Sequence, residues 1–169
     1  MSKLKRGDTF IIDGIEFMVL KETKCGYKCL AENYRRMTFG NNNNWKESDI
    51  RSELNEKFLK KLVEAVGEEN IIPFDRDLTS LDGLKDYGTC TDHVSILSFD
   101  EYRENRDIIE NDKWICTLTP DSSKSNGDEV LLTVVAPSGY IRNGIFCDNC
   151  FGVRPVCIFD SSIFESEDE

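Results

Sequence analysis

Hydrophobic and polar positions alternate near both ends of this chain, in a pattern that predicts β-strands. Residues 9–12 and 15–20 are apolar runs separated by Asp13-Gly14, a dipeptide typical of a hairpin turn. A turn at residues 24–26 then leads to a third strand over residues 27–31. The later part of the chain predicts further strands over residues 94–97, 114–118, 130–135, 140–141 and 153–159, joined by turns at Pro137-Ser138-Gly139 and Asn143-Gly144.

Apolar residues recur with a helical period between the N-terminal strands and the middle of the chain. Ser48 is a good helix cap, and Ile50, Leu54 and Phe58 follow at intervals of four residues, which places them on one face of a helix. The apolar stripe continues to about Gly67, a residue that often ends helices. We therefore expect this face to pack against the core.

The second predicted helix has the clearest local signal in the chain. Ser98 and Glu101 have the spacing of a capping box, in which each side chain bonds the backbone of the other. Leu97 and Tyr102 stand where a hydrophobic staple places its two residues. The pattern predicts a helix from Ser98 to about Glu110.

Together these elements predict an α+β protein with antiparallel sheets and two helices between them. The 169 residues suffice for one domain, which we assign to residues 1–160, followed by an acidic C-terminal tail over residues 161–169. No apolar run is long enough to span a membrane, and the first residues lack the apolar core of a signal peptide. These features predict a cytoplasmic protein, in the cytosol of a host cell, that is a monomer.

Four of the seven cysteines form two close pairs. Cys25 and Cys29 are a C-x3-C pair, and Cys147 and Cys150 are a C-x2-C pair. Two such pairs on turns can supply the four thiolates of a tetrahedral structural zinc site. The alternatives are unliganded thiols or, for the second pair, a redox site without the usual β-α-β context. The remaining cysteines are interpreted as small buried hydrophobic residues: Cys90, Cys116 and Cys157.

The formal net charge of −11 restricts the class of partner. Direct binding to a phosphate backbone needs a basic surface, so no direct contact with nucleic acid is expected. An acidic surface favours a basic protein partner, because complementary potentials speed and select encounters. The alternative is that the charge serves only solubility.

No motif in the chain identifies a reaction, and we predict that the protein is not an enzyme. The single histidine, His93, is interpreted as a structural or surface residue. The segment at residues 75–80 begins like a calcium loop but lacks the glycine of the sixth position. Asp49 and Arg51, at a helix start, are expected to serve capping and an ion pair rather than catalysis.

The order of several motifs resembles a known family. Gly7-Asp8-Thr9 opens a strand, and a helix opens with Trp45, Ser48-Asp49-Ile50-Arg51 and Leu54-Asn55. The chain continues with Ser95-Ile96-Leu97-Ser98, Glu101-Tyr102, Trp114 and finally Gly152-Val153-Arg154-Pro155. Over nearly the whole chain this resembles a domain of unknown function that is common in Firmicutes proteins and their phages, a variant of the C-type lectin-like fold.

The resemblance implies a scaffold whose first and last strands pair and whose loops carry recognition. Such pairing could bring the two cysteine turns to one edge of a sheet, which adds support for zinc. The cysteine pairs are particular to this chain, however, and residues 115–117 depart from the aromatic or arginine residues of the family. The Glu-Pro-Asn, Gln-Pro-Asp and Trp-Asn-Asp motifs of calcium-dependent lectins are absent, so calcium-dependent sugar binding is not predicted.

Two functions follow as hypotheses. The first is a phage or mobile-element inhibitor that binds a basic, nucleic-acid-handling host protein, in concrete form an anti-CRISPR that blocks DNA loading by a CRISPR effector nuclease. The second is a lectin-like surface or virion module that binds a glycan or protein ligand. Its candidate contacts are Trp45, Tyr140 and the Asn41–Asn44 loop, although Trp45 also fits a core position.

Overall fold

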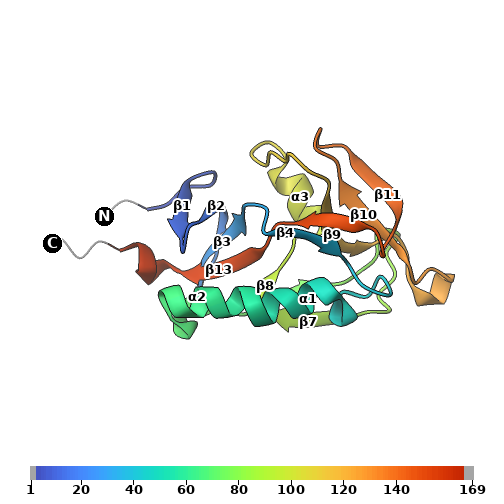
Figure 1. Ribbon diagram of the computed structural model, residues 1–169, viewed down its shortest axis with the longest axis horizontal. Coiled ribbons are helices and arrows are strands. Elements are labelled where there is room, and N and C mark those ends of the chain that lie inside the picture. The colour runs from blue at the N-terminus through green and yellow to red at the C-terminus, as the bar shows by residue number, and fades with distance from the viewer. Residues whose placement is uncertain (1–2, 166–169) are drawn as a thin grey trace.

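The computed structural model describes residues 3–165, which form two main sheets, a small hairpin and a long helix (Figure 1). The first sheet is six-stranded, and its strands are β1 (Thr9–Ile12), β2 (Ile15–Glu22), β3 (Gly26–Ala31), β13 (Val156–Asp160), β5 (Ile71–Ile72) and, paired with β13, β8 (Val94–Ser95). Within this range no helix combines the length and the apolar character needed to cross a membrane.

The second sheet is five-stranded and mostly antiparallel. Its strands, in spatial order, are β11 (Ile141–Phe146), β10 (Leu131–Val135), β9 (Ile115–Pro120), β12 (Cys150–Val153) and β4 (Arg35–Thr38). The small hairpin and the helices comprise β6 (Phe74–Asp77), β7 (Thr89–Asp92), α1 (Asp49–Glu53), α2 (Leu59–Val66) and α3 (Phe99–Asn105). The arrangement confirms the α+β class with mostly antiparallel sheets.

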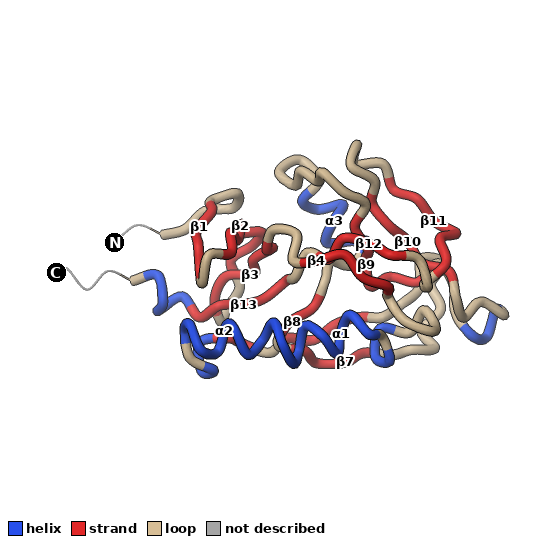
Figure 2. The backbone as a smooth tube through the Cα atoms, viewed as in Figure 1, coloured by secondary structure: helices blue, strands red, loops and turns tan. Residues whose placement is uncertain are grey.

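The helix predicted from Ser48 is present and packs along both sheets. Its two α-helical parts, α1 and α2, are joined without a break by the π-helical turn Leu54–Phe58. Figures 1 and 2 show this rod running beneath the molecule, and α1 contacts β4 while α2 contacts β1 and β5. The apolar stripe of Ile50, Leu54, Phe58 and Leu62 is fully buried, as its period predicted.

Trp45, Arg51 and Asn55, at the start of the long helix, bind one short segment at the end of β7. The Trp45 indole donates to one carboxylate oxygen of Asp92 at 2.7 Å, and Arg51 Nε donates to the other at 2.7 Å. The Asn55 amide donates to the Val94 carbonyl at 2.8 Å and accepts from the Val94 amide at 3.0 Å. This helical segment is therefore a structural clamp, and the expected ion pair of Arg51 is confirmed.

A second buried carboxylate, Glu101, joins three parts of the fold. Arg76 in β6 donates to both of its oxygens, at 2.8 and 2.5 Å, and Lys28 in β3 donates at 2.7 Å. The backbone amide of Ser98 donates to the same carboxylate at 2.9 Å, which completes the predicted capping box of α3. Arg76 also donates to the carbonyl of Ile96 at 2.8 Å and to the hydroxyl of Ser95 at 3.0 Å, so each of its three guanidinium nitrogens has a hydrogen-bond partner.

The hydrophobic staple of α3 agrees with the prediction, but the helix is shorter than predicted. Leu97 and Tyr102 belong to one buried cluster. The helix ends at Asn105 rather than near Glu110. One reason is visible in the chain: the Asn105 side-chain amide donates to the Glu101 carbonyl at 2.8 Å and competes with the backbone bonds of the helix end. Residues 106–108 continue as a turn.

The prediction that the first and last strands pair needs a correction. The last strand, β13, does enter the N-terminal sheet, but it lies between β3 and β5. The first strand, β1, pairs with β2 at the sheet edge. The apolar character of β13 fits its position, because a central strand is covered on both faces.

The predicted acidic tail starts in ordered structure. Residues Ser161–Phe164 form a short 3-10 turn, and the Phe164 ring packs on Phe10 with centroids 4.7 Å apart. The tail residues 166–169 lie outside the described part of the chain.

We expect Glu101→Gln to lower the free energy of unfolding by roughly 3–5 kcal/mol, because it leaves Arg76 buried without its ion partner. Burial raises the pKa of Glu101, but Arg76 and Lys28 outweigh it and bring the pKa from 4.5 to about 2. The stabilisation should thus be complete above pH 4.5 and fade as the pH falls toward about 2.

Urea denaturation of both proteins across this pH range measures the effect. The control is Glu104→Gln, on the exposed side of the same helix. Equal stability of wild type and Glu101→Gln at neutral pH would contradict the structural role of this carboxylate.

Candidate functional site

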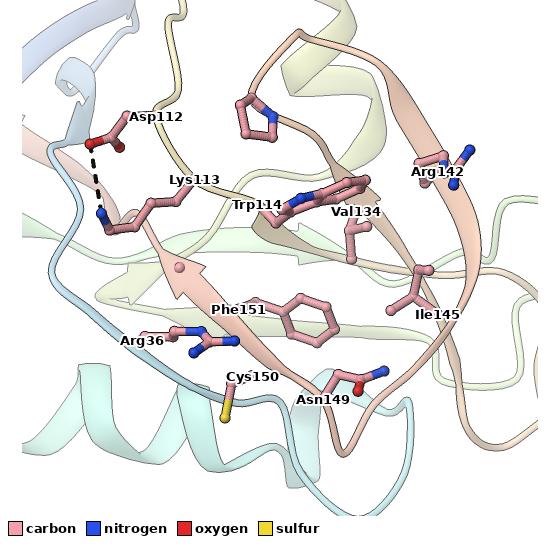
Figure 3. A pocket seen from close by; sticks show the side chains of 12 residues that line it. Arg36, Asp112, Lys113, Trp114, Val134, Arg142, Ile145, Asn149, Cys150 and Phe151 are labelled. Carbon is pink, nitrogen blue, oxygen red and sulfur yellow. Dashed lines mark ion pairs between the residues drawn. The ribbon is translucent and has the colours of Figure 1, made fainter.

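A hollow of roughly 640 Å³ lies against the second sheet and combines aromatic and cationic side chains, which makes it a candidate binding site (Figure 3). We call it the Trp114 hollow. Its aromatic and cationic side chains come from β4, β11, β12 and the segment before β9: Arg36, Arg142, Phe151, Lys113 and Trp114. Figure 3 shows Trp114 and Phe151 in the middle, with Arg36 and Arg142 at opposite sides. The volume lies in the range of small-ligand sites.

Trp114 is the unusual member of this group, because a large part of its ring is open to solvent. It is 43% exposed, whereas the other tryptophan, Trp45, is 1% exposed in the core. The Gly152 amide donates to the Trp114 carbonyl at 2.8 Å, which fixes the backbone where β9 begins. A Cβ atom on Gly152 would lie 3.1 Å from that carbonyl and 2.8 Å from Asn33 Oδ1, so glycine permits this close approach.

Arg154 supports the same segment from inside. Its guanidinium donates to the carbonyls of Ala31 and Glu110 and to Asn111 Oδ1, each at 2.9 Å. Burial lowers the pKa of this arginine, while nearby carboxylates raise it. The Gly152-Val153-Arg154-Pro155 motif therefore positions the loop that carries Trp114.

A β-bulge aims β11 at the hollow. The sequence predicted a turn at Asn143-Gly144, and this prediction was wrong, because both residues lie inside β11. Arg142 is opposite Val134 and Ile145 is opposite Leu132, so β11 has one extra residue between the pairs. Gly144 takes a φ of 73°, and the bulge turns both Arg142 and Ile145 toward the hollow.

The charge of the hollow is opposite to that of the protein. It has three cationic side chains against one carboxylate, Asp112, which lies 3.7 Å from Lys113. Within residues 3–165, neither Arg36 nor Arg142 lies within ion-pair distance of a carboxylate, and Arg142 instead lies 5.9 Å from the Tyr140 ring. By contrast, carboxylates pair with most other arginines: Arg6, Arg35, Arg51, Arg76 and Arg103.

The two cysteine pairs lie in different sheets. Cys25 is exposed in the turn before β3, and Cys29 is buried in β3 opposite Cys157. Cys147 is buried and Cys150 exposed where β11 turns into β12. Across the described residues, no group of three or more His, Cys, Asp or Glu side chains is arranged to hold a metal ion. Zinc binding by the four thiols stays a prediction.

Burial keeps most of the cysteines in the thiol form. It raises the pKa of Cys29 strongly, and burial together with Asp148 raises that of Cys147. Burial raises the pKa of Cys116 and Cys157 as well, each with a smaller effect from a neighbouring cysteine. The prediction that Cys116 and Cys157 are buried is confirmed, and Cys90 is half-buried.

The predicted recognition residues have mixed positions. Trp45 is a core residue, as its alternative interpretation held. Asn43, in the asparagine loop, is buried and donates to the carbonyls of Ser122 and Leu131. Tyr140 is 64% exposed and lies next to β11. Of these candidates, Tyr140 is the one near the Trp114 hollow.

His93 and the calcium-like segment at residues 75–80 both lie beside side chains that hold the fold together. His93 is half-buried beside Asp92, whose carboxylate already binds Trp45 and Arg51. The calcium-like segment contains β6, where Arg76 points inward to Glu101. Asp77 binds the amide and hydroxyl of Thr79, and these bonds lower its pKa.

Sequence reasoning did not find the Trp114 hollow. Arg36 and Arg142 are more than 100 positions apart, and no local pattern joins them. The sequence offered one signal for this site, a tryptophan at position 114 directly after the charged residues Asp112 and Lys113.

Comparison with known protein families, characterised proteins and solved structures finds no match to this chain.

Proposed function

We propose that this is a non-enzymatic recognition protein that binds its ligand in the Trp114 hollow. The observation that carries the proposal is the meeting of a solvent-exposed tryptophan with two arginines that have no carboxylate partner among residues 3–165. Exposed aromatic and arginine side chains are the groups that contribute most to binding energy in protein interfaces. In an acidic protein, unpaired guanidinium groups gain by meeting an anionic group of a ligand.

The proposal agrees with a C-type lectin-like scaffold, which we propose for this chain. Its support is the return of β13 into the N-terminal sheet and the position of the hollow in the C-terminal half of the fold. The extended turns around the second sheet also fit a scaffold that presents a recognition surface. The function is thus that of a surface or virion recognition module.

We expect Arg36→Ala/Arg142→Ala to bind at least tenfold less of the natural ligand than the wild type, because each change removes a charge-assisted hydrogen bond. Tagged protein is incubated with host lysate and with cell-envelope fractions, and the retained material is quantified by mass spectrometry. Melting temperatures should stay unchanged, since both side chains are exposed.

The matched control is Lys60→Ala/Lys61→Ala, which removes two exposed positive charges from α2. It should retain the same material as the wild type. Undiminished capture by Arg36→Ala/Arg142→Ala would contradict the proposal that this hollow is the binding site.

A second candidate is an inhibitor of a basic, DNA-handling host protein, of the anti-CRISPR type. The observation that favours it is a concentration of carboxylates around the loops at residues 82–86 and 121–129. Asp82 and Asp86 bind Ser122 and Ser123 there, at 2.7 and 2.6 Å. Burial raises the pKa of Tyr87 to about 12, with help from Glu129 and three further carboxylates. These two loops carry five carboxylates and two lysines, so this part of the surface is net negative.

If this second function holds, the protein should weaken DNA binding by a CRISPR effector nuclease, and more so at low salt. Glu129→Gln should inhibit less than the wild type, while Glu64→Gln on α2 should not differ from it. Electrophoretic mobility shifts with a panel of nucleases measure this. Unchanged DNA binding across the panel would rule the function out.

A further inference from the structure

We infer that the Trp114 hollow binds a short acidic oligosaccharide, in which sugar rings carry carboxylate or phosphate groups. The inference rests on the proposed function and names the ligand class for the same site. Its basis is the combination of a partly exposed tryptophan, cationic side chains at opposite sides, and the amide of Asn149 in the lining.

The aromatic part of the hollow suits a sugar ring better than a nucleobase. Trp114 is partly exposed and Phe151 is buried, so the described lining does not offer two open rings that could hold a base between them. The negative face of an indole attracts the partly positive C–H groups of a sugar. The Asn149 amide and the Asp112 carboxylate are in reach of hydroxyl groups, which both donate and accept hydrogen bonds.

The arginines come from the two edges of the second sheet. Arg36 is on β4 and Arg142 is on β11, the two edge strands, and Figure 3 shows their side chains at opposite sides of the hollow. They can therefore meet anionic groups at opposite sides of one ligand, and a hollow of roughly 640 Å³ accommodates a short oligosaccharide.

The net charge of the chain favours a short ligand over a long polyanion. At physiological salt the Debye length is about 8 Å, so a ligand within the hollow interacts mainly with the charges that line it: Arg36, Lys113 and Arg142, opposed by Asp112. A nucleic acid would extend past the hollow onto a surface with a total charge of −11, and would be repelled there.

Titration of the tryptophan fluorescence of the intact protein tests the inference. The probes are a uronic-acid trisaccharide, a phosphorylated disaccharide, a neutral trisaccharide of equal length and a short single-stranded oligonucleotide. We expect at least one acidic saccharide to bind ten times more tightly than the neutral one. Arg36→Ala and Arg142→Ala should each weaken that binding five- to tenfold, and Lys60→Ala should leave it unchanged.

The outcomes separate the inference from the function on which it rests. A preference for the uronic acid or for the phosphorylated sugar supports the inference and identifies the anionic group. Tighter binding of the neutral sugar or the oligonucleotide overturns it, as does no binding of any probe. If capture from cells still depends on Arg36 and Arg142 in that case, the proposed function stands without the saccharide. If capture does not depend on them, both are wrong.

Discussion

The buried carboxylate of Glu101 is the contact on which the arrangement of the sheets depends. Arg76 and Lys28 reach it from β6 and β3, and the carboxylate in turn caps α3. The same helix places Tyr102, whose hydroxyl donates to the carbonyl of Gly139 at 3.2 Å. Gly139 lies in the turn between β10 and β11, so this ion cluster helps to position the strand that carries Arg142.

Charge pairing inside the protein also explains why the Trp114 hollow stands out. In a chain with 32 acidic and 21 basic residues, an arginine readily finds a carboxylate. The buried carboxylates of Asp92 and Glu101 pair with Arg51 and Arg76. A buried carboxylate without such a partner would lower the free energy of unfolding. Arg154 holds the loop at the hollow by donating to the carbonyls of Ala31 and Glu110, which are neutral groups. These bonds therefore add no carboxylate to the hollow. The Trp114 hollow thus differs from the rest of the described structure, because its cationic side chains outnumber its carboxylates.

Local signals predicted much of the fold. The capping box at Ser98, the turn at Asp13-Gly14 and the stripe beginning at Ile50 depend on neighbours within a few residues, and the structure has all three. Pairings between distant segments were not predictable in this way. Strand β4 pairs with β12, which lies more than 100 residues later in the chain. The bulge at Gly144 exists only in the pairing of β11 with β10. The hollow depends on both of these pairings, and for that reason its residues were missed.

The most direct test of the positive hollow compares how iodide and caesium ions quench tryptophan fluorescence. Trp45 is buried, so the accessible signal comes from Trp114. Relative to the quenching of free tryptophan by each ion, nearby arginines should favour iodide in spite of the net charge of −11, and Arg36→Ala/Arg142→Ala should reduce or reverse that preference. Stronger quenching by caesium in the wild type, with no change in the double variant, would contradict the account.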